Sequence, residues 1–500
     1  MKNFKDNFYL QYALLLAAAF LFVGKPVPYS NESSYLLRLI KVYHPQFLLN
    51  DLTFSAPANE HWLFDHLFGL LTFVFSIEFI GWIGRIGCWA ILLFALVRLG
   101  RHWKIPLWMI TVSIFLWLCG GQSIVADEWI IGVFEAKCVA YVCLLFALDG
   151  FCNEREIYPA ILLGLSFSFH PAVGLWAIPA VILALAFCRR DFVRIIKITI
   201  IAGIFSLAGL VPLLSSVIAD NPSSADDWKF AVLVGYPFHF DPFSWAKSSI
   251  ILVFLLLAFC LVFYHRNKPE RAEKFLLAFL SVLCVFFSAG IILRAFGQYE
   301  LLRFMPARLF PVFAPLFFLF TLAKAYRQKV FVPPVTLLML IGFVCLLGWE
   351  SPISRGFMQI QQTANYWRSG RDGAAESFVW LKNNTPNGTI VISPPWRNDF
   401  WYLSGRAQIV SYIYAPISNL REWRERLNLL IGNAPAEKGL RDVKEMKIFY
   451  NNLPAEKIIE ISAEYKARYI VTEGEYDFPL VFKSGTYKIY RLPAPSDLVL

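Results

Sequence analysis

The sequence has little charge, and its cysteines and histidines follow no pattern that suits a metal centre or a disulfide framework. Asp, Glu, Lys and Arg together make up 16% of the 500 residues. All nine cysteines lie in or beside apolar runs without a CxxC pair, and the seven histidines form no HxxH or HxxxH pair. Disulfide-stapled secreted domains and zinc enzymes depend on such spacings. The sequence therefore indicates neither a disulfide-stapled secreted domain nor a zinc enzyme.

Two further absences narrow the possible functions. The sequence contains no glycine-rich loop of the kind that cradles the phosphates of a nucleotide, so a nucleotide-sugar donor is not indicated. No internal repeat relates one half of the chain to the other, whereas many transporters are built from such repeats. The sequence therefore favours neither a nucleotide-dependent enzyme nor a transporter.

Apolar residues dominate the composition. They make up 57% of the chain, and the mean hydropathy is +0.54, which exceeds what the core of a soluble domain requires. The net charge is +10, but the Lys and Arg residues fall in short clusters between apolar runs, as they do in cytoplasmic loops. The sequence therefore indicates a polytopic membrane protein whose basic excess reflects topology, and no nucleic-acid partner is expected.

Long apolar runs predict the membrane crossings. A spanning helix needs about 17–25 residues, and runs of this order occur at 8–24, 80–98, 106–121, 137–151, 157–170, 172–188, 195–217, 248–265, 273–294, 303–324 and 331–349. The first run precedes no small-x-small cleavage site, so we interpret it as a helix and not as a signal peptide. We predict a mainly α-helical, polytopic transmembrane bundle of about eleven spans over residues 1–349.

The basic clusters predict the orientation of the bundle. With the N-terminus in the cytoplasm, all of them fall on the cytoplasmic side if the segment 62–78 does not cross the membrane. That segment carries Asp65 and His66, and we expect it to be an interfacial helix within a first external loop, 25–79. The runs 157–170 and 172–188 meet at His170-Pro171. Whether they are two spans or a re-entrant pair, the C-terminal region lies outside.

The last part of the chain, residues 350–500, changes to a soluble mixture of residues and is expected to form an external, periplasmic domain. Helices are expected over 371–383 and 422–431, and strands over 389–393, 469–472 and 486–492. Helices that alternate with strands indicate a small α/β domain.

Polar side chains gather in three segments predicted to lie at the outer ends of helices, where function in a membrane protein is expected. The first segment contains Asn31, Glu32, Tyr35 and Asp51, the second contains Asp127 and Glu128, and the third contains Arg294, Glu300, Arg303 and Arg308. Arg85 lies inside a predicted span, where an arginine costs about 2.5–3.5 kcal/mol. We therefore expect Arg85 to pair with Asp65 or with an external carboxylate.

The first of these segments resembles the GT-C superfamily of polyprenyl-phosphate-sugar-dependent glycosyltransferases. In that superfamily, a large first external loop opens with an acidic residue soon after the first helix and continues through a juxtamembrane helix into the second span. Asn31-Glu32-Ser33-Ser34-Tyr35, the segment 62–78 and the span 80–98 stand in this order. The chain also resembles a bacterial family of multispanning proteins related to the superfamily, over 45–51, 169–176 and 380–406.

The resemblance implies a sugar donor carried on a polyprenyl phosphate, a glycan, lipid or protein acceptor, and transfer at the outer face of a bacterial inner membrane. Inverting transfer needs one carboxylate as a general base and cations for the leaving phosphate. Glu32 is the expected base. The other expected members of the site are a carboxylate for the acceptor or for a divalent metal ion, Asp127 or Glu128; a phosphate clamp, Arg294, Arg303 or Arg308; and further substrate contacts, Asn31, Tyr35, Asp51, Arg85, His170 and Glu300.

Each of these residues also has a structural interpretation. Glu32 fits the start of a helix near Ser33, and Asp51 fits a turn or a cap. Asp127-Glu128 fits the cap of a short external helix, the arginines of the third segment fit the membrane interface, and His170 fits a packed helix end. A non-catalytic protein that binds a lipid-linked saccharide or scaffolds envelope assembly would share the fold. Tolerance of substitution at Glu32 and Asp127 would favour that alternative.

Overall fold

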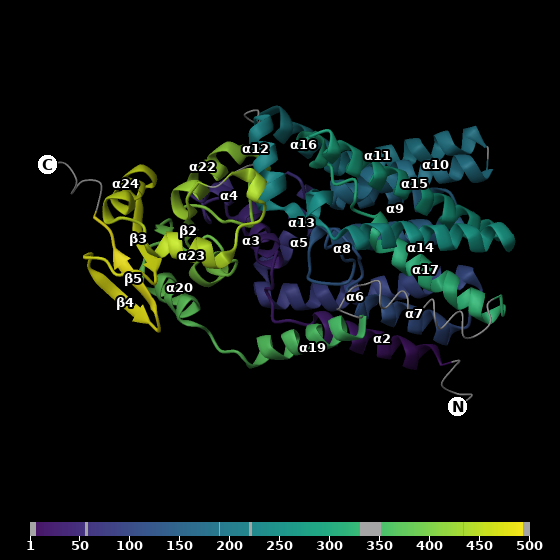
Figure 1. Cartoon of the computed structure of the whole chain (residues 1–500), viewed down its shortest axis with the longest axis horizontal. Helices are drawn as coiled ribbons and strands as arrows, with labels where there is room; N and C mark the ends of the chain where they lie inside the picture. The colour runs from purple at the N-terminus through teal and green to yellow at the C-terminus, as the bar shows by residue number, and fades with distance from the viewer. Residues whose placement is uncertain are drawn as a thin grey trace.

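The computed structural model describes residues 7–55, 59–189, 191–219, 223–330, 352–433 and 435–493. Most of them form helices, which build a bundle with a smaller domain at one end (Figure 1). The helices up to residue 330 are α2 (Phe8–Val23), α3 (Glu32–Tyr43), α4 (Leu52–Ser55), α5 (Trp62–Gly69), α6 (Ile77–Gly100), α7 (Leu107–Cys119), α8 (Ala136–Cys152), α9 (Ile157–Phe169), α10 (Pro171–Arg189), α11 (Phe192–Ala219), α12 (Ala225–Phe230), α13 (Pro237–Phe240), α14 (Lys247–Arg266), α15 (Arg271–Ala295), α16 (Tyr299–Leu302) and α17 (Phe310–Arg327). The later helices are α19 (Pro352–Arg368), α20 (Gly373–Asn384), α21 (Phe400–Ser404), α22 (Leu420–Ile431), α23 (Val443–Asn451) and α24 (Ala455–Tyr465).

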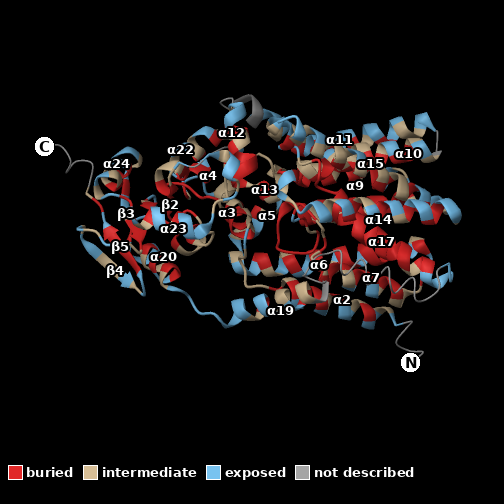
Figure 2. Cartoon of the chain, in the orientation of Figure 1, coloured by how far each residue is buried: buried red, intermediate tan, exposed pale blue. Residues whose placement is uncertain are grey.

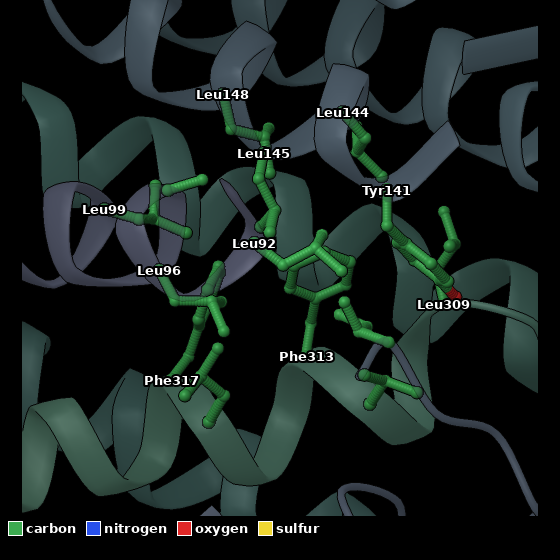
Figure 3. Close-up of a cluster of buried hydrophobic side chains, with 14 of the residues drawn as sticks. Leu92, Leu96, Leu99, Tyr141, Leu144, Leu145, Leu148, Leu309, Phe313 and Phe317 are labelled. Carbon is green, nitrogen blue, oxygen red and sulfur yellow. The ribbon is translucent and has the colours of Figure 1, made fainter. Parts of the chain in front are cut away.

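Leucine and aromatic side chains fill the centre of the bundle, where α6, α8 and α17 meet (Figure 3). Leu92 of α6, Leu145 of α8 and Phe313 of α17 gather there and are fully buried. Between helices in a membrane such side chains stabilise by close van der Waals packing, because lipid tails are as apolar as leucine. This core therefore fixes the positions of the three helices that carry or flank the polar residues described below.

Helices occupy the predicted apolar runs up to residue 330, and the last run, 331–349, lies outside the described residues. Five helical segments among the described residues are long and apolar enough to cross a membrane: Ile77–Trp103, Pro171–Cys188, Phe192–Ser215, Lys247–Arg266 and Arg271–Ala295. Helices α2, α7 and α9 are apolar but shorter. The structure indicates a membrane protein, whereas the number of about eleven crossings stays a prediction.

Several helices of the bundle expose apolar faces to the surroundings (Figure 2). Along α11, Ile196, Ile200 and Ile204 follow one another at helical spacing, and each is more than half exposed. Soluble monomers rarely expose a continuous apolar stripe of this kind. Leu70 and Phe73, which follow α5, are also exposed, in keeping with the interfacial helix expected over 62–78.

The loops that the sequence assigns to the cytoplasm meet at one end of the bundle. Nζ of Lys104 lies 2.6 Å from Oε1 of Glu270, and Nε of Arg194 lies 2.7 Å from Oε1 of Glu156. The start of α2 lies toward this end, and the C-terminal domain lies at the opposite end (Figure 1). These contacts bring two pairs of the basic loops together, whereas the orientation of the bundle in a membrane stays a prediction.

Helices α9 and α10 form a tight hairpin at His170. Gly174 lies so close to the chain at Phe167 that a Cβ atom at residue 174 would lie 2.2 Å from the Cα atom of Phe167. A side chain at residue 174 would therefore force the two helices apart. The hairpin places His170 at the same end of the bundle as the outer loops.

A five-stranded mixed sheet forms the centre of the C-terminal domain. Its strands are β1 (Ile390–Ile392), β2 (Ala407–Gln408), β3 (Ala467–Thr472), β4 (Leu480–Ser484) and β5 (Tyr487–Arg491), in the order β2-β1-β3-β5-β4. β1 is parallel to β2 and β3, whereas β5 is antiparallel to β3 and β4, with Val471 opposite Ile489. The predicted helices correspond to α20 and α22, and the predicted strands correspond to β1, β3 and β5. β2, β4, α19, α21, α23 and α24 were not predicted from the sequence.

The first external loop ties the C-terminal domain to the bundle through Asp51. The carboxylate of Asp51 is buried and accepts hydrogen bonds from Nε1 of Trp401 (2.6 Å) and from the backbone N–H of Gln408 (3.0 Å). It also accepts hydrogen bonds from the backbone N–H groups of Thr53 and Phe54 in α4. Asp51 thus caps a helix and joins two parts of the chain, which agrees with its structural interpretation.

Candidate functional site

The loop between α7 and α8, residues 120–135, is held in place by side chains of its own sequence. Oε1 of Gln122 accepts hydrogen bonds from the backbone N–H groups of Ile130 (2.9 Å) and Ile131 (2.8 Å). Gln122, Ala126 and Asp127 have positive φ angles of 70°, 68° and 48°. Residues other than glycine rarely adopt such angles, and those that do gather at functional sites. The loop therefore combines a fixed backbone with local strain.

Glu32 begins α3 and is enclosed by its partners. Its two carboxylate oxygens bind the guanidinium of Arg85, with 2.7 Å between Nε and Oε1, and both side chains are fully buried. Oε1 also accepts the backbone N–H of Phe134 (2.9 Å), and Oε2 accepts that of Tyr29 (3.1 Å). The partner of Arg85 is thus an external carboxylate, as expected, and it is not Asp65. Glu32 anchors the end of the loop 120–135 to α6.

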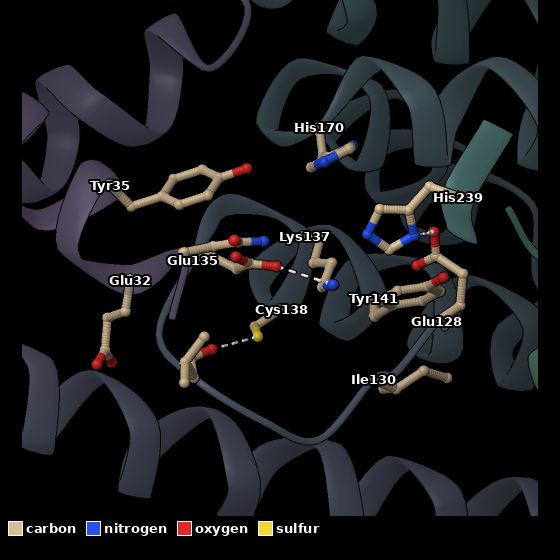
Figure 4. Close-up of polar contacts among 12 residues, drawn as sticks. Glu32, Tyr35, Glu128, Ile130, Glu135, Lys137, Cys138, Tyr141, His170 and His239 are labelled. Atoms are coloured by element: carbon tan, nitrogen blue, oxygen red, sulfur yellow. Dashed lines mark hydrogen bonds and ion pairs between the residues drawn. The ribbon is translucent and has the colours of Figure 1, made fainter. Parts of the chain in front are cut away.

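A second group of buried polar side chains lies next to this ion pair (Figure 4). We call it the outer polar cluster, and it consists of Glu128, Glu135, Lys137, His170, His239 and Arg308. Nη1 of Arg308 lies 2.6 Å from Oε1 of Glu128, and its Nη2 lies 3.2 Å from Nε2 of His170. Nδ1 of His239 lies 3.5 Å from the same oxygen of Glu128. The fold thus brings four segments that are distant in sequence to one place.

Glu135 and Lys137 form the second ion pair of the cluster. Nζ of Lys137 lies 2.9 Å from Oε1 of Glu135, and both side chains are buried. The same Nζ lies 3.4 Å from the centre of the Trp129 ring, a favourable position for a cation. Figure 4 shows Glu135 directed into the cluster, whereas Glu32 points away from it. The two carboxylates therefore differ in what they can contact.

Tyr35 and His61 extend the cluster toward α3 and α5. The OH of Tyr35 lies 3.4 Å from Nε2 of His61, whose ring centre lies 4.8 Å from that of His170. Burial lowers the pKa of His61 to about 3 and the pKa of His239 to about 4, and nearby arginines add to the effect. Both imidazoles are therefore neutral at physiological pH, so each has one nitrogen that accepts a hydrogen bond.

Four buried atoms of the outer polar cluster have no hydrogen-bond partner in the described part of the chain: Oε2 of Glu128, Oε2 of Glu135, Nδ1 of His170 and Nε of Arg308. A buried polar atom without a partner costs about 1–3 kcal/mol, so its presence requires an explanation. Burial raises the pKa of Glu128, although the charges of Arg308 and Lys137 act in the opposite direction. Each of these atoms can therefore bind a further polar group.

The arginines of the third outer segment separate into two groups. Arg308 belongs to the cluster, whereas Arg294 lies elsewhere and pairs with Asp241 at 2.6 Å. Arg303 is exposed, and its guanidinium lies 5.3 Å from the centre of the Trp228 ring. Of the three expected phosphate ligands, only Arg308 is buried among carboxylates.

Most of the other candidate residues lie outside the cluster. Glu300 is exposed on α16, and Asp127 is exposed beside Glu128. Asn31 precedes α3 without a hydrogen bond from its side chain to the helix, and Asp51 lies at the junction with the C-terminal domain. His170 is a member of the cluster, and Tyr35 contacts His61 beside it, as described above.

The expected divalent metal ion finds no complete ligand set among the residues that the structure describes. No three side chains of His, Cys, Asp or Glu are placed there to bind one ion. The carboxylates at the outer end, Glu32, Glu128 and Glu135, each bind an arginine or a lysine instead.

Several members of the cluster are absent from the set predicted from the sequence. Glu135 and Lys137 flank the start of α8, and a charged pair at the edge of an apolar run was the signal that could have identified them. His239, and His61 in the extension of the cluster, carry no such signal, because an isolated histidine near an apolar helix is usually a packing residue. Their contribution follows only from the tertiary contacts.

Asp65 of α5 provides a test of the buried polar region by pH. Burial raises the pKa of Asp65 from 3.8 to about 8, and its Oδ1 has no hydrogen-bond partner in the described part of the chain. The folded protein therefore keeps a proton that the unfolded chain releases, so stability should fall as the pH rises from about 4 to about 8. In Asp65→Asn this contribution is absent. We therefore expect the melting temperature of Asp65→Asn to gain on that of the wild type when the pH is raised from 5 to 8. The same difference in melting temperature at both pH values would contradict the assignment.

Comparisons with known proteins identify the fold. No protein-family model matches the sequence, and no curated protein matches it. Among solved structures, the oligosaccharyltransferase of Archaeoglobus fulgidus is similar in its apo form, with a TM-score of 0.52, 13% identity, and coverage of 93% of this chain and 70% of that chain.

Two further structures of the A. fulgidus oligosaccharyltransferase are similar as well. The complex with an inhibitory peptide and a dolichol-phosphate has a TM-score of 0.52 and 12% identity, with coverage of 93% of this chain and 69% of that chain. The complex with Zn and sulfate has a TM-score of 0.50 and 11% identity, with coverage of 92% and 67%. The chain therefore shares the fold of this oligosaccharyltransferase over most of its length.

Proposed function

We propose that the chain is a membrane glycosyltransferase, which moves a sugar from a polyprenyl-phosphate-linked donor to an acceptor at the outer face of a bacterial inner membrane. The fold supports this proposal, because similar structures belong to an enzyme that transfers saccharides. The observation that carries it is the outer polar cluster, where buried carboxylates and cations meet and four atoms lack partners among the described residues. Buried charges in a membrane protein mark functional sites.

The distribution of basic residues gives the orientation in this proposal. The loops rich in Lys and Arg meet at one end of the bundle, and such loops face the cytoplasm in most membrane proteins. The outer polar cluster and the C-terminal domain lie at the other end. In this proposal they face the periplasm, where a lipid-linked donor and an acceptor would meet.

The reaction requires one base and one site for the leaving group. A hydroxyl or amine of the acceptor attacks the anomeric carbon of the sugar, a new bond forms there, and the bond from this carbon to the phosphate oxygen breaks. We assign Glu128 to accept the proton of the acceptor, since its Oε2 has no hydrogen-bond partner among the residues that the structure describes and its raised pKa favours proton uptake. Arg308 is placed to bind the polyprenyl phosphate that leaves.

Glu32 has a supporting role in this scheme. Its oxygens are occupied by Arg85 and by two backbone N–H groups, which leaves it poorly suited to accept a proton. Because it binds the N–H of Phe134, it positions the loop that carries Glu128 and Glu135. Asp127 is exposed next to Glu128 and is assigned to the acceptor side, together with the C-terminal domain.

Glycan analysis of the producing cell tests the proposal. We expect deletion of the gene to remove one envelope glycan, as measured by mass spectrometry. Wild-type protein and Glu425→Gln, which changes an exposed carboxylate of α22, should restore the glycan, whereas Glu128→Gln should not. An unchanged glycan profile after deletion would contradict the proposal. Retained binding of a polyprenyl phosphate without transfer would instead favour the non-catalytic alternative of the same fold.

A further inference from the structure

Three buried carboxylates at the outer end of the bundle form ion pairs with basic side chains. Glu32 binds Arg85, Glu128 binds Arg308 at 2.6 Å, and Glu135 binds Lys137 at 2.9 Å. A divalent ion needs several free oxygen or nitrogen ligands. Here a fixed cation already holds one oxygen of each carboxylate, so a metal ion would have to displace an arginine or a lysine.

The three ion pairs differ in how many of their hydrogen-bonding atoms have partners. The guanidinium of Arg85 donates hydrogen bonds to both oxygens of Glu32 and to the backbone carbonyl of Lys25. The pair of Arg308 with Glu128 leaves Nε and Oε2 without partners in the described part of the chain, and the pair of Lys137 with Glu135 leaves Oε2 of the glutamate without one. The first pair is therefore closed and structural, whereas the other two keep capacity for a ligand.

A purely structural role does not account for the two open pairs. Buried ion pairs recover their desolvation cost only when the remaining hydrogen-bonding atoms are satisfied, and apolar residues of similar size are often as stable. Lys137 and Tyr141 are neighbours on one face of α8, because they are four residues apart. The OH of Tyr141 donates a hydrogen bond to the backbone carbonyl of Arg308 at 3.4 Å, so Arg308 lies beside the face of α8 that carries Lys137.

We propose that Arg308 and Lys137 bind the donor's phosphate directly, without a bridging divalent ion, and that this binding draws both cations away from Glu128 and Glu135. The inference rests on the proposed function. An arginine fork and a lysine ammonium are the side chains that proteins use for phosphate. The phosphate oxygens take the place of the two carboxylates as hydrogen-bond acceptors and as the negative charge beside both cations. Glu128 then becomes free to take the proton of the acceptor only when the donor is in place.

Binding measurements on the purified full chain test this inference. The probes are a polyprenyl phosphate and the matching polyprenol, which lacks the phosphate, each with EDTA and with added Mn²⁺. We expect the phosphate to bind equally well under both conditions and more tightly than the polyprenol. Arg308→Gln and Lys137→Met should each weaken binding of the phosphate by about tenfold or more, without an effect on the polyprenol. Arg421→Gln, which changes an exposed arginine of α22, should leave both affinities unchanged.

Two outcomes would overturn the inference. One is loss of phosphate binding in EDTA with recovery in Mn²⁺, and the other is equal affinity for the phosphate and the polyprenol. Lys137→Arg serves as a folding control, because it keeps the charge and should retain most of the binding that Lys137→Met loses. If transfer occurs but requires Mn²⁺, the inference fails while the proposed function stands. If the phosphate binds without metal but no sugar moves, the proposed function fails while the phosphate site stands.

Discussion

Arg85→Met is expected to lower the free energy of unfolding by about 3–5 kcal/mol, because it leaves Glu32 buried without its cation. Both side chains are fully buried, and the guanidinium contacts both carboxylate oxygens. Thermal unfolding of the purified protein, followed by intrinsic fluorescence, measures the effect. Limited proteolysis should also show new cleavage in the loop 120–135, since the N–H of Phe134 depends on Glu32 for its position.

A double variant separates the loss of the pair from the loss of side-chain volume. Arg85→Met combined with Glu32→Leu removes both charges and keeps apolar bulk, so it should recover much of the stability that the single variant loses. If the double variant is as unstable as Arg85→Met alone, an unpaired charge is not the cause. A loop that stays resistant to protease in the single variant would contradict the anchoring role of Glu32.

Glu128→Gln should reduce the rate of sugar transfer by about 10²–10⁴, the usual contribution of a general base. Glutamine keeps the shape of the side chain and its contact with Arg308 but does not take up a proton. Single-turnover assays with a polyprenyl-phosphate sugar measure this rate. Because burial raises the pKa of Glu128, the wild-type rate should still rise with pH above 4.5, the ordinary pKa of this carboxyl group, as the base loses its proton.

The matched control for this prediction is Glu425→Gln, an exposed carboxylate of α22, which should transfer sugar at the wild-type rate. A Glu128→Gln protein with wild-type transfer would eliminate Glu128 as the base. If Glu32→Gln lost transfer while the loop 120–135 kept its protection from protease, the base would be the carboxylate that the sequence first indicated.

The sequence predicts the helices of the bundle well, because hydropathy over a window of residues depends only on local composition. It also predicts the longer strands of the C-terminal domain, which are apolar and bounded by turn residues. It misses β2 and β4, since β2 has two residues and β4 is a largely exposed edge strand. Such strands depend on their neighbours in the sheet and have no clear signal of their own.

The site was harder to predict than the fold, because its contacts join residues far apart in sequence. Glu32 and Arg85 are separated by 53 positions, and Glu128 and Arg308 by 180. Which charges meet depends on the order and rotation of packed helices, and hydropathy contains neither quantity. The sequence could therefore list charged residues at the outer ends of helices, but it could not tell the closed pair at Glu32 from the open pairs at Glu128 and Glu135.

The most direct measurement is a cryo-electron microscopy structure of the full chain in a lipid nanodisc that contains a polyprenyl-phosphate sugar. We expect density for the phosphate within hydrogen-bonding distance of Arg308 and Lys137, with the sugar beside Glu128. Density for the lipid only on the outer surface of the helices, with the pairs Arg308–Glu128 and Lys137–Glu135 unchanged, would contradict it.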